Sequence, residues 1–362
     1  MIALFNRFPT LENRLPHTEL GVWPTPVDCI SGTAIGVDYV YVKRDDITGS
    51  AYGGNKVRKL EFLLAEAKRR SAREVMTFGF AGSNHATATA VYANQLGLRG
   101  ISMLMPQAIS HGLRRNLLLS HASGALLKHY GGVRRVAAGA LLTSAMRRIK
   151  IGVFPMIIPA GGSSPLGICG FVNAALELKK QIDDGTLPAP PVIYVAVGSM
   201  GTVAGLAIGL QAAGLNTRIA AIRVIHATMA SEDRLKKLFA QTVAYLRRLD
   251  TSFPDVRWIP GQVEWRNEFF GSDYAVYTAE GVEAADWFWK QTGLALDGTY
   301  SAKGLAALVH DARSGRLAGQ TPLFWNTFNS RPAFDAVNEL DYKQLPPAFH
   351  RYFEEDVQPL DR

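Results

Sequence analysis

The regular alternation of strand-like and helix-like segments constrains the fold of this chain more than any other feature. Short apolar runs have the length of buried strands, and stretches with apolar residues at helical spacing follow them. This order is typical of βαβ units, which build mostly parallel sheets. We therefore predict an α/β protein that binds its ligand at the carboxyl ends of the strands. Strands are predicted at 37–43, 74–80, 100–105, 125–130, 156–160, 192–197, 219–225 and 323–325. Helices are predicted at 56–70, after residue 83, and at 113–121, 136–149, 166–182, 203–213, 232–249, 279–291 and 303–313, with an irregular arm at 1–36.

The composition narrows the classes of partner. The chain has 362 residues, of which 48% are hydrophobic and 19% charged, and its formal net charge is +8. The basic residues occur in scattered pairs rather than in a long run, so we expect an anionic small ligand and no nucleic acid. Cys29 and Cys169 lack zinc-type spacing, and no uncharged apolar run reaches membrane-spanning length. We expect no metal, no membrane partner and a cytoplasmic location.

The stretch 52–61 (YGGNKVRKLE) places a lysine at the start of a predicted helix. Gly53 and Gly54 permit a tight turn, and Asn55 is a favoured N-cap residue. Lys56 then lies on the first helical turn, where the macrodipole and nearby Lys59 disfavour a second positive charge. An amine that loses its proton this readily suits Schiff-base formation. An ordinary basic first turn would have the same sequence.

A second strand–turn–helix stretch, 192–205 (VIYVAVGSMGTVAG), is typical of a phosphate site. Gly198 and Gly201 let the backbone approach a ligand closely, and the amides of the following helix point toward it. The order of residues matches neither a nucleotide P-loop nor a full dinucleotide fingerprint, so a single phosphate fits better. A tight turn without a ligand remains the alternative.

Two further stretches carry candidate polar groups. Ser83, Asn84 and His85 begin a helix, where amides and a hydroxyl can bind a carboxylate and the Asn84 amide can bind a phenolic oxygen. Simple N-capping by Ser83 or Asn84 is the alternative. Tyr300 and Ser301 lie ahead of a helix near the end of the chain, and a loop tyrosine serves either as an acid or base or as packing.

A Schiff-base lysine, a phosphate cup, an amide beside a phenol and a carboxylate-binding helix end are together what pyridoxal 5′-phosphate requires. The chain also resembles the D-cysteine desulfhydrase and 1-aminocyclopropane-1-carboxylate (ACC) deaminase family, which has the tryptophan-synthase-β-like fold, fold type II. The resemblance spans nearly the whole chain and rests on stretches in the family's order: 6–9 (NRFP), 43–46 (KRDD), 53–61 (GGNKVRKLE), 83–85 (SNH), 159–164 (PAGGSS), 198–202 (GSMGT) and Tyr300.

This resemblance implies two open, twisted, mostly parallel sheets flanked by helices, with the cofactor in the cleft between domains. Residues 1–58 and 166–362 would form the larger, cofactor-binding domain, and residues 59–165 the smaller one. We expect a homodimer that acts on a small amino acid. Lys56 would hold the cofactor covalently, and Asn84 would meet its O3′ atom. The other cofactor contacts implied are Lys59, Gly198, Ser199, Met200, Gly201, Thr202, Ser301 and Thr327. Ser83, Asn84, His85, Gly162, Tyr274 and Tyr300 would face the substrate, with catalytic roles for Lys56, Ser83, Tyr274 and Tyr300.

The leading functional hypothesis is a lyase that eliminates a β-substituent and releases a 2-oxo acid and ammonia. β-Replacement, ACC deamination and cofactor binding without turnover are the alternatives. Segments 86–89 (ATAT) and 326–330 (NTFNS) depart from the family, which has an arginine-bearing stretch and a His-Thr-Gly-Gly run there. Ser301 stands where the family's ACC deaminases have a glutamate against the pyridine nitrogen. A serine there favours a neutral ring and elimination of a good leaving group, unless it only caps a helix.

Overall fold

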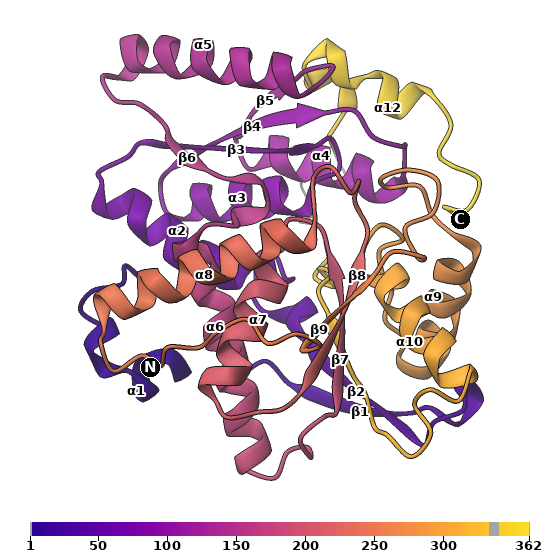
Figure 1. Ribbon diagram of the computed structural model, residues 1–362. Coiled ribbons are helices and arrows are strands. Elements are labelled where there is room, and N and C mark those ends of the chain that lie inside the picture. The colour runs from indigo at the N-terminus through magenta and orange to yellow at the C-terminus, as the bar shows by residue number, and fades with distance from the viewer. Residues whose placement is uncertain (1, 333–339, 362) are drawn as a thin grey trace.

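The computed structural model describes residues 2–332 and 340–361 and contains two β-sheets with helices on both faces of each (Figure 1). The six-stranded sheet has the order β1-β2-β10-β7-β8-β9, and the four-stranded sheet has the order β5-β4-β3-β6. All pairings are parallel except β1 with β2. The predicted α/β class with two mostly parallel sheets is confirmed. The strands are β1 (Val27–Ser31), β2 (Tyr39–Arg44), β3 (Glu74–Phe80), β4 (Arg99–Met105), β5 (Leu126–His129), β6 (Met156–Ile158), β7 (Val192–Val197), β8 (Arg218–Arg223), β9 (Val263–Arg266) and β10 (Leu323–Asn326).

The helices form layers over the two sheets. In Figure 1, α5 lies above the four-stranded sheet, whereas α2, α3 and α4 lie below it. The helices α6 and α7 lie on one side of the six-stranded sheet, and α9 and α10 lie on the other. No helix in the described ranges is both long and apolar enough to cross a membrane. The helices are α1 (Ala3–Arg7), α2 (Lys56–Arg69), α3 (Asn84–Gln95), α4 (His111–Ala122), α5 (Val133–Ile151), α6 (Pro165–Asp183), α7 (Gly201–Ala212), α8 (Glu232–Leu249), α9 (Ala279–Thr292), α10 (Ser301–Arg313) and α12 (Arg351–Glu354).

The prediction of an irregular arm at residues 1–36 is wrong, because this segment contains α1 and β1. The strand β9 was also missed. The strands β1 and β9 are short and only partly buried. Neither has the continuous apolar run by which the other strands were predicted. The strands of the four-stranded sheet lie within residues 74–158, and those of the six-stranded sheet lie within residues 27–44 and 192–326. We propose the domain division on that basis, with its first boundary at residue 58 inside α2.

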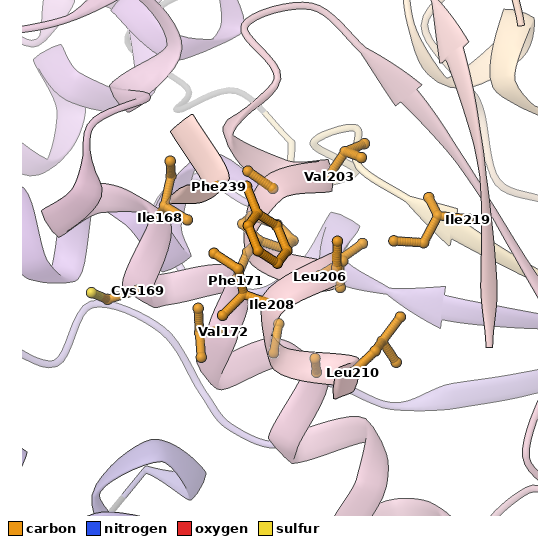
Figure 2. Packing of buried hydrophobic residues seen from close by; sticks show 14 of the residues in the cluster. Ile168, Cys169, Phe171, Val172, Val203, Leu206, Ile208, Leu210, Ile219 and Phe239 are labelled. Carbon is orange, nitrogen blue, oxygen red and sulfur yellow. The ribbon is translucent and has the colours of Figure 1, made fainter. Parts of the chain in front are cut away.

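The largest core lies where α6 and α7 pack on the six-stranded sheet (Figure 2). Phe171 of α6, Leu206 of α7 and Phe239 of α8 meet there and are almost fully buried. A Cβ atom at Gly205 would lie 2.3 Å from the Cβ atom of Phe171, and one at Gly209 would lie 2.6 Å from that of Ala175. These glycines therefore let α7 approach α6 closely, which fixes the start of α7 at the cleft.

A buried ion network joins α2 to the larger sheet and to α6. The guanidinium of Arg58 donates to Asp45 at 2.7 Å and to Glu177 at 2.9 Å, and Lys43 donates to Glu177 at 2.6 Å. The indole of Trp325 on β10 donates to Asp45 at 2.8 Å. Burial raises the pKa of Glu177, but Arg58 and Lys43 outweigh this effect and hold the pKa at about 2. The network therefore keeps its charges while buried.

Arg58→Ala is expected to destabilise the fold by about 3–5 kcal/mol, because it leaves the two carboxylates without their main counter-ion. Urea unfolding followed by circular dichroism measures this. Arg69→Ala on the same helix is the control, since the Arg69 side chain is 67% exposed although it pairs with Glu66 at 2.6 Å. That change should cost less than about 1 kcal/mol. Equal effects of the two substitutions would contradict this view of the network.

Candidate active site

A cavity of about 600 Å³ lies at the carboxyl ends of strands from both sheets. It brings together the start of α2, the turn between β3 and α3, the turn between β7 and α7, and the residues before α10. Most of the residues expected at the site line this cavity: Lys56, Ser83, Asn84, His85, Gly198, Ser199, Met200, Thr202, Tyr274, Tyr300 and Thr327.

Lys56 is the first residue of α2 and is only partly exposed. Burial lowers the pKa of its amine to about 8, although the negative charge of Asp297 opposes this effect. The direction agrees with the sequence prediction, but burial rather than Lys59 is the main cause. Asn55 does not cap α2 as predicted, because it is helical itself and its side chain caps no amide. The Asn55 side chain instead accepts from the Lys56 amine through its Oδ1 atom at 2.9 Å and donates to the Thr202 hydroxyl through its Nδ2 atom at 3.1 Å.

The segment 326–330, which departs from the family pattern, closes over the turn ahead of Lys56. The side chain of Asn329 accepts from the backbone amide of Gly53 at 2.6 Å. The backbone carbonyl of Thr327 accepts from the backbone amide of Asn55 at 3.2 Å. Gly54 has a φ of +89°, and a Cβ atom there would lie 3.0 Å from the Thr327 carbonyl oxygen. The altered segment therefore supports the lysine turn, and Thr327 reaches the cavity from it.

The turn before α7 forms a small polar cup. Met200, the residue before α7, adopts the left-handed conformation with φ of +66°, and its own side chain does not cap the helix. The hydroxyl of Ser163 accepts from the Gly201 amide at 3.2 Å and donates to Ser199 at 2.8 Å. The amine of Lys59 lies 3.4 Å from the Ser163 hydroxyl. Hydroxyls, amides and one amine thus surround the start of α7.

The cup fits a phosphate group. A Cβ atom at Gly201 would lie 2.4 Å from the Ser163 hydroxyl and 2.8 Å from the Lys59 amine, so only glycine leaves room for both groups there. Exposed helix-start amides bind anions well. Burial, followed by the charge of Lys56, lowers the pKa of Lys59 well below its usual value. An anionic ligand would restore the charge on this amine and be held by it.

The start of α3 presents polar groups to the same cavity. Ser83 caps the helix by accepting from the Ala86 amide at 3.2 Å, so the capping alternative holds, and Ser83 also lines the cavity. The side-chain oxygen of Asn84 accepts from the side chain of Asn116 at 2.8 Å, while the side-chain NH₂ group of Asn84 donates to no described protein atom. His85 is buried without a hydrogen-bond partner among the described residues. Burial, then the charges of Lys56 and Lys59, lower the pKa of His85 well below its usual value, so its ring is neutral.

The other departure from the family, segment 86–89, lies inside α3. All four of its side chains are buried, and none of them lines the cavity. Thr87 and Thr89 donate to helix carbonyls four residues earlier. These residues pack the helix and do not contact a ligand in the cavity.

Two tyrosines that line the cavity form a hydroxyl pair. The hydroxyls of Tyr274 and Tyr300 lie 2.6 Å apart, and Tyr274 stacks on Phe80 with ring centroids 4.1 Å apart. Burial raises the pKa of Tyr300 to about 12 and raises that of Tyr274 well above its usual value. Both phenols are therefore neutral near pH 7, and the pair can donate a proton to a ligand.

Asp297 is a cavity residue that the sequence analysis did not single out. Its carboxylate accepts from the Tyr300 amide at 2.6 Å and from the Ser301 hydroxyl at 2.7 Å. Ser301 is only 1% exposed and does not line the cavity, so its hydroxyl is directed to Asp297. The stretch DGTYS at 297–301 was the available signal, because a turn aspartate commonly binds amides two or three residues later.

Four expected residues lie just outside the cavity lining. Gly201 and Lys59 belong to the cup, Ser301 is held by Asp297, and Gly162 lies beside His85 and Lys59. The sequence analysis missed several lining residues, because only the tertiary fold brings them to the site. These are Asn55, Ser163, Asp297 and an apolar set that includes Phe78, Met105, Val136, Ala137, Ala140, Met229 and Leu238.

Thr202→Asp is expected to weaken retention of pyridoxal phosphate by at least about tenfold, because it sets a carboxylate against the phosphate in the cup. Ser199→Ala should cost only about 1 kcal/mol of binding free energy, since it removes one hydrogen bond. Thr202→Ser is the matched control that keeps the hydroxyl. Equilibrium dialysis of the cofactor measures all three. Unchanged retention in Thr202→Asp would place the phosphate elsewhere.

The attachment of pyridoxal phosphate to Lys56 should depend on pH with a midpoint near 8. Only the neutral amine is a nucleophile, so the rate in cofactor-free protein should rise about tenfold per pH unit below the pKa and level off above it. Stopped-flow absorbance measures the rate. Asp297→Asn should move the midpoint to lower pH, because the Asp297 charge raises the Lys56 pKa. A rate that keeps rising to pH 10 would indicate an ordinary exposed lysine.

Comparisons with known proteins identify the family of the chain. A family model described as pyridoxal-phosphate dependent enzyme matches residues 18–327. The D-cysteine desulfhydrases of Klebsiella pneumoniae and Serratia proteamaculans are 32% and 31% identical to this chain; they cover 91% and 90% of it, and the matches span 99% and 97% of those proteins. The crystal structure of an ACC deaminase homologue has a TM-score of 0.76 at 32% identity, covering 90% of this chain and 94% of that one. The chain therefore belongs to the pyridoxal-phosphate-dependent enzymes, in the group that contains D-cysteine desulfhydrases and ACC deaminase homologues.

Proposed function

We propose that the protein is a lyase that eliminates the β-substituent of a small amino acid and releases a 2-oxo acid and ammonia, with D-cysteine as the first substrate to test. One observation carries the proposal: a single cavity is lined by Lys56, whose amine has a pKa of about 8, and by the neutral phenols of Tyr274 and Tyr300. A base and a proton donor in one cavity match the two proton transfers of an elimination. The D-cysteine desulfhydrase relatives support this reaction class.

The cofactor would be held at both ends of its ring system. Lys56 would bind its aldehyde carbon, and the NH₂ group of Asn84 is free to meet its phenolic oxygen. The cup would bind its phosphate through Lys59, Ser163, Ser199 and the amides that begin α7. When bound, pyridoxal phosphate accepts the electron pair that remains after the Cα proton is removed. The protein residues supply orientation and proton transfer.

The substrate would be oriented by the start of α3. The Ser83 hydroxyl and the first amides of this helix would bind the carboxylate, as helix-start groups do. Lys56, once freed from the cofactor, would take the Cα proton, because burial keeps part of its amine neutral near pH 7. Tyr300, paired with Tyr274, would give a proton to the leaving group on Cβ.

ACC deamination is the second candidate. The structure of the ACC deaminase homologue aligns with 90% of this chain, and Asp297 supplies a carboxylate to the wall where Ser301 alone was expected. A carboxylate near the pyridine ring favours ring protonation, which assists ring opening. Two assays separate the candidates. The lyase would release pyruvate from β-chloroalanine and from cysteine, each tested in both chiralities, whereas an ACC deaminase would release 2-oxobutyrate from ACC. Faster turnover of ACC than of every β-substituted substrate would refute the lyase proposal.

Tyr300→Phe should lower the elimination rate by about 10²–10⁴-fold for cysteine, but by much less for β-chloroalanine. A thiolate leaves more easily when it receives a proton, whereas chloride leaves without one. Steady-state release of pyruvate from both substrates measures the difference. Tyr277→Phe is the control, because Tyr277 is a nearby tyrosine outside the main cavity. Equal losses for both substrates would contradict the proton-donor role.

We also propose that the protein forms a homodimer. The support for this proposal is a group of exposed apolar side chains. They gather on α5 and the segment after it, where Leu141, Leu142, Ile149 and Phe154 are 76%, 62%, 85% and 61% exposed. Light scattering should give twice the mass of the chain, and joint replacement of Leu142 and Ile149 by Glu should lower it. A monomeric wild type would refute the proposal. We place the protein in the cytoplasm, in agreement with the free thiols of Cys29 and Cys169.

A further inference from the structure

The cavity is divided into a polar part and an apolar part. The polar groups belong to the starts of α2, α3 and α7 and to the residues before α10, and the proposed reaction uses them. Among the described residues that line the cavity, Lys56 and Asp297 are the charged ones, since His85 is neutral. The remaining wall is apolar and comes from other elements. No step of the proposed reaction on cysteine requires this wall.

Both domains contribute to the apolar wall. Phe78 of β3 and Met105 at the end of β4 come from the four-stranded sheet, and Val136 and Ala140 come from α5 above it. Met229, which precedes α8, and Leu238, which belongs to it, come from the other domain. Phe78, Met105, Met229 and Leu238 are only partly buried, so they still have apolar surface to cover. A ligand that fills this space would bury that surface.

The side chain of cysteine is too small to use such a wall. It ends at one sulfur atom beyond Cβ, the atom that the phenols of Tyr274 and Tyr300 would protonate. An alkyl or aryl group attached to that sulfur would extend the substrate into cavity space that the reacting atoms leave free and that apolar side chains line. Apolar walls with a few polar groups at one end are typical of sites that select a ligand by its apolar part.

We propose that the substrates of this enzyme are cysteine S-conjugates that carry a bulky apolar alkyl or aryl group, which binds against the Phe78–Met105–Val136–Ala140–Met229–Leu238 wall. The proposal rests on the proposed lyase function and specifies its substrate class. The Cα–H and Cβ–S bonds break, the sulfur receives a proton and leaves as the free thiol, and one water is consumed. The products are the thiol, pyruvate and ammonia, so no oxidant or reductant is needed.

S-Ethylcysteine and S-hexylcysteine of both chiralities provide the test, with β-chloroalanine as the small reference substrate. Both conjugates release alkyl thiolates of similar basicity and differ only in four methylene groups. Each methylene buried on binding contributes about fourfold. We expect kcat/KM for S-hexylcysteine to exceed that for S-ethylcysteine by at least about tenfold. Coupled assays of pyruvate and of free thiol measure both products.

Two matched variants on α5 locate the binding site of the apolar group. Ala137 lines the cavity and is exposed, so Ala137→Phe would fill the apolar part without crowding the core. This variant should reduce the S-hexyl to S-ethyl ratio by at least about tenfold. Ala138 is also exposed but does not line the cavity, so Ala138→Phe should leave the ratio unchanged. Circular dichroism of both variants checks the fold.

The outcomes separate this proposal from the function on which it rests. Equal kcat/KM values for the two conjugates, in an enzyme that turns over β-chloroalanine, would overturn the substrate class and leave the lyase function intact. A ratio that Ala137→Phe and Ala138→Phe change equally would also overturn it. No pyruvate from any of these substrates, in either chirality, would overturn both.

Discussion

The site depends most on the buried ion pairs that the Arg58 guanidinium forms with Asp45 and Glu177. Arg58 lies two residues after Lys56 on the same helix, and it holds Asp45 after β2 and Glu177 on α6 at once. Buried ion networks seldom add much net stability, because desolvation offsets the attraction. Their geometry is nevertheless specific, since each charge must find its partners. The network thus fixes the direction of the first turn of α2, and with it the position of the Lys56 amine.

The position of the polar cup at the start of α7 depends on how α7 packs on α6. Gly205 and Gly209 bring α7 against α6, and Gly201, one turn earlier, leaves room for the Ser163 hydroxyl and the Lys59 amine at the start of α7. Ser163 begins the turn into α6, so the two helices carry both halves of the cup. The spacing of four residues between these glycines therefore serves the core and the ligand site together.

Local sequence was sufficient for the elements and the site groups whose signals are local. The bounds of β3, β7 and α8 were predicted as observed, because apolar runs and a capped amphipathic pattern mark them. Lys56 and the cup were found from glycines beside predicted helix starts. Short, half-buried β1 and β9 gave no such signal. The role of Asn55 could not be predicted, since the tertiary fold chooses its partner: its side-chain amide donates to Thr202 instead of capping α2. The bond between Asp297 and the Ser301 hydroxyl is local, so its signal was present in the stretch DGTYS but was overlooked.

The position of β10 has a consequence for synthesis of the chain. This strand lies between β2 and β7, near the middle of the larger sheet, yet it is the last strand of the described sequence. More than a hundred residues separate the end of β7 from β10, which takes on the order of ten seconds to translate at about 5–20 residues per second. Until then β2 and β7 each keep an unpaired edge, which is a template for wrong pairing. The nascent enzyme should therefore need a chaperone on the ribosome, and premature stop codons before residue 323 should give insoluble fragments.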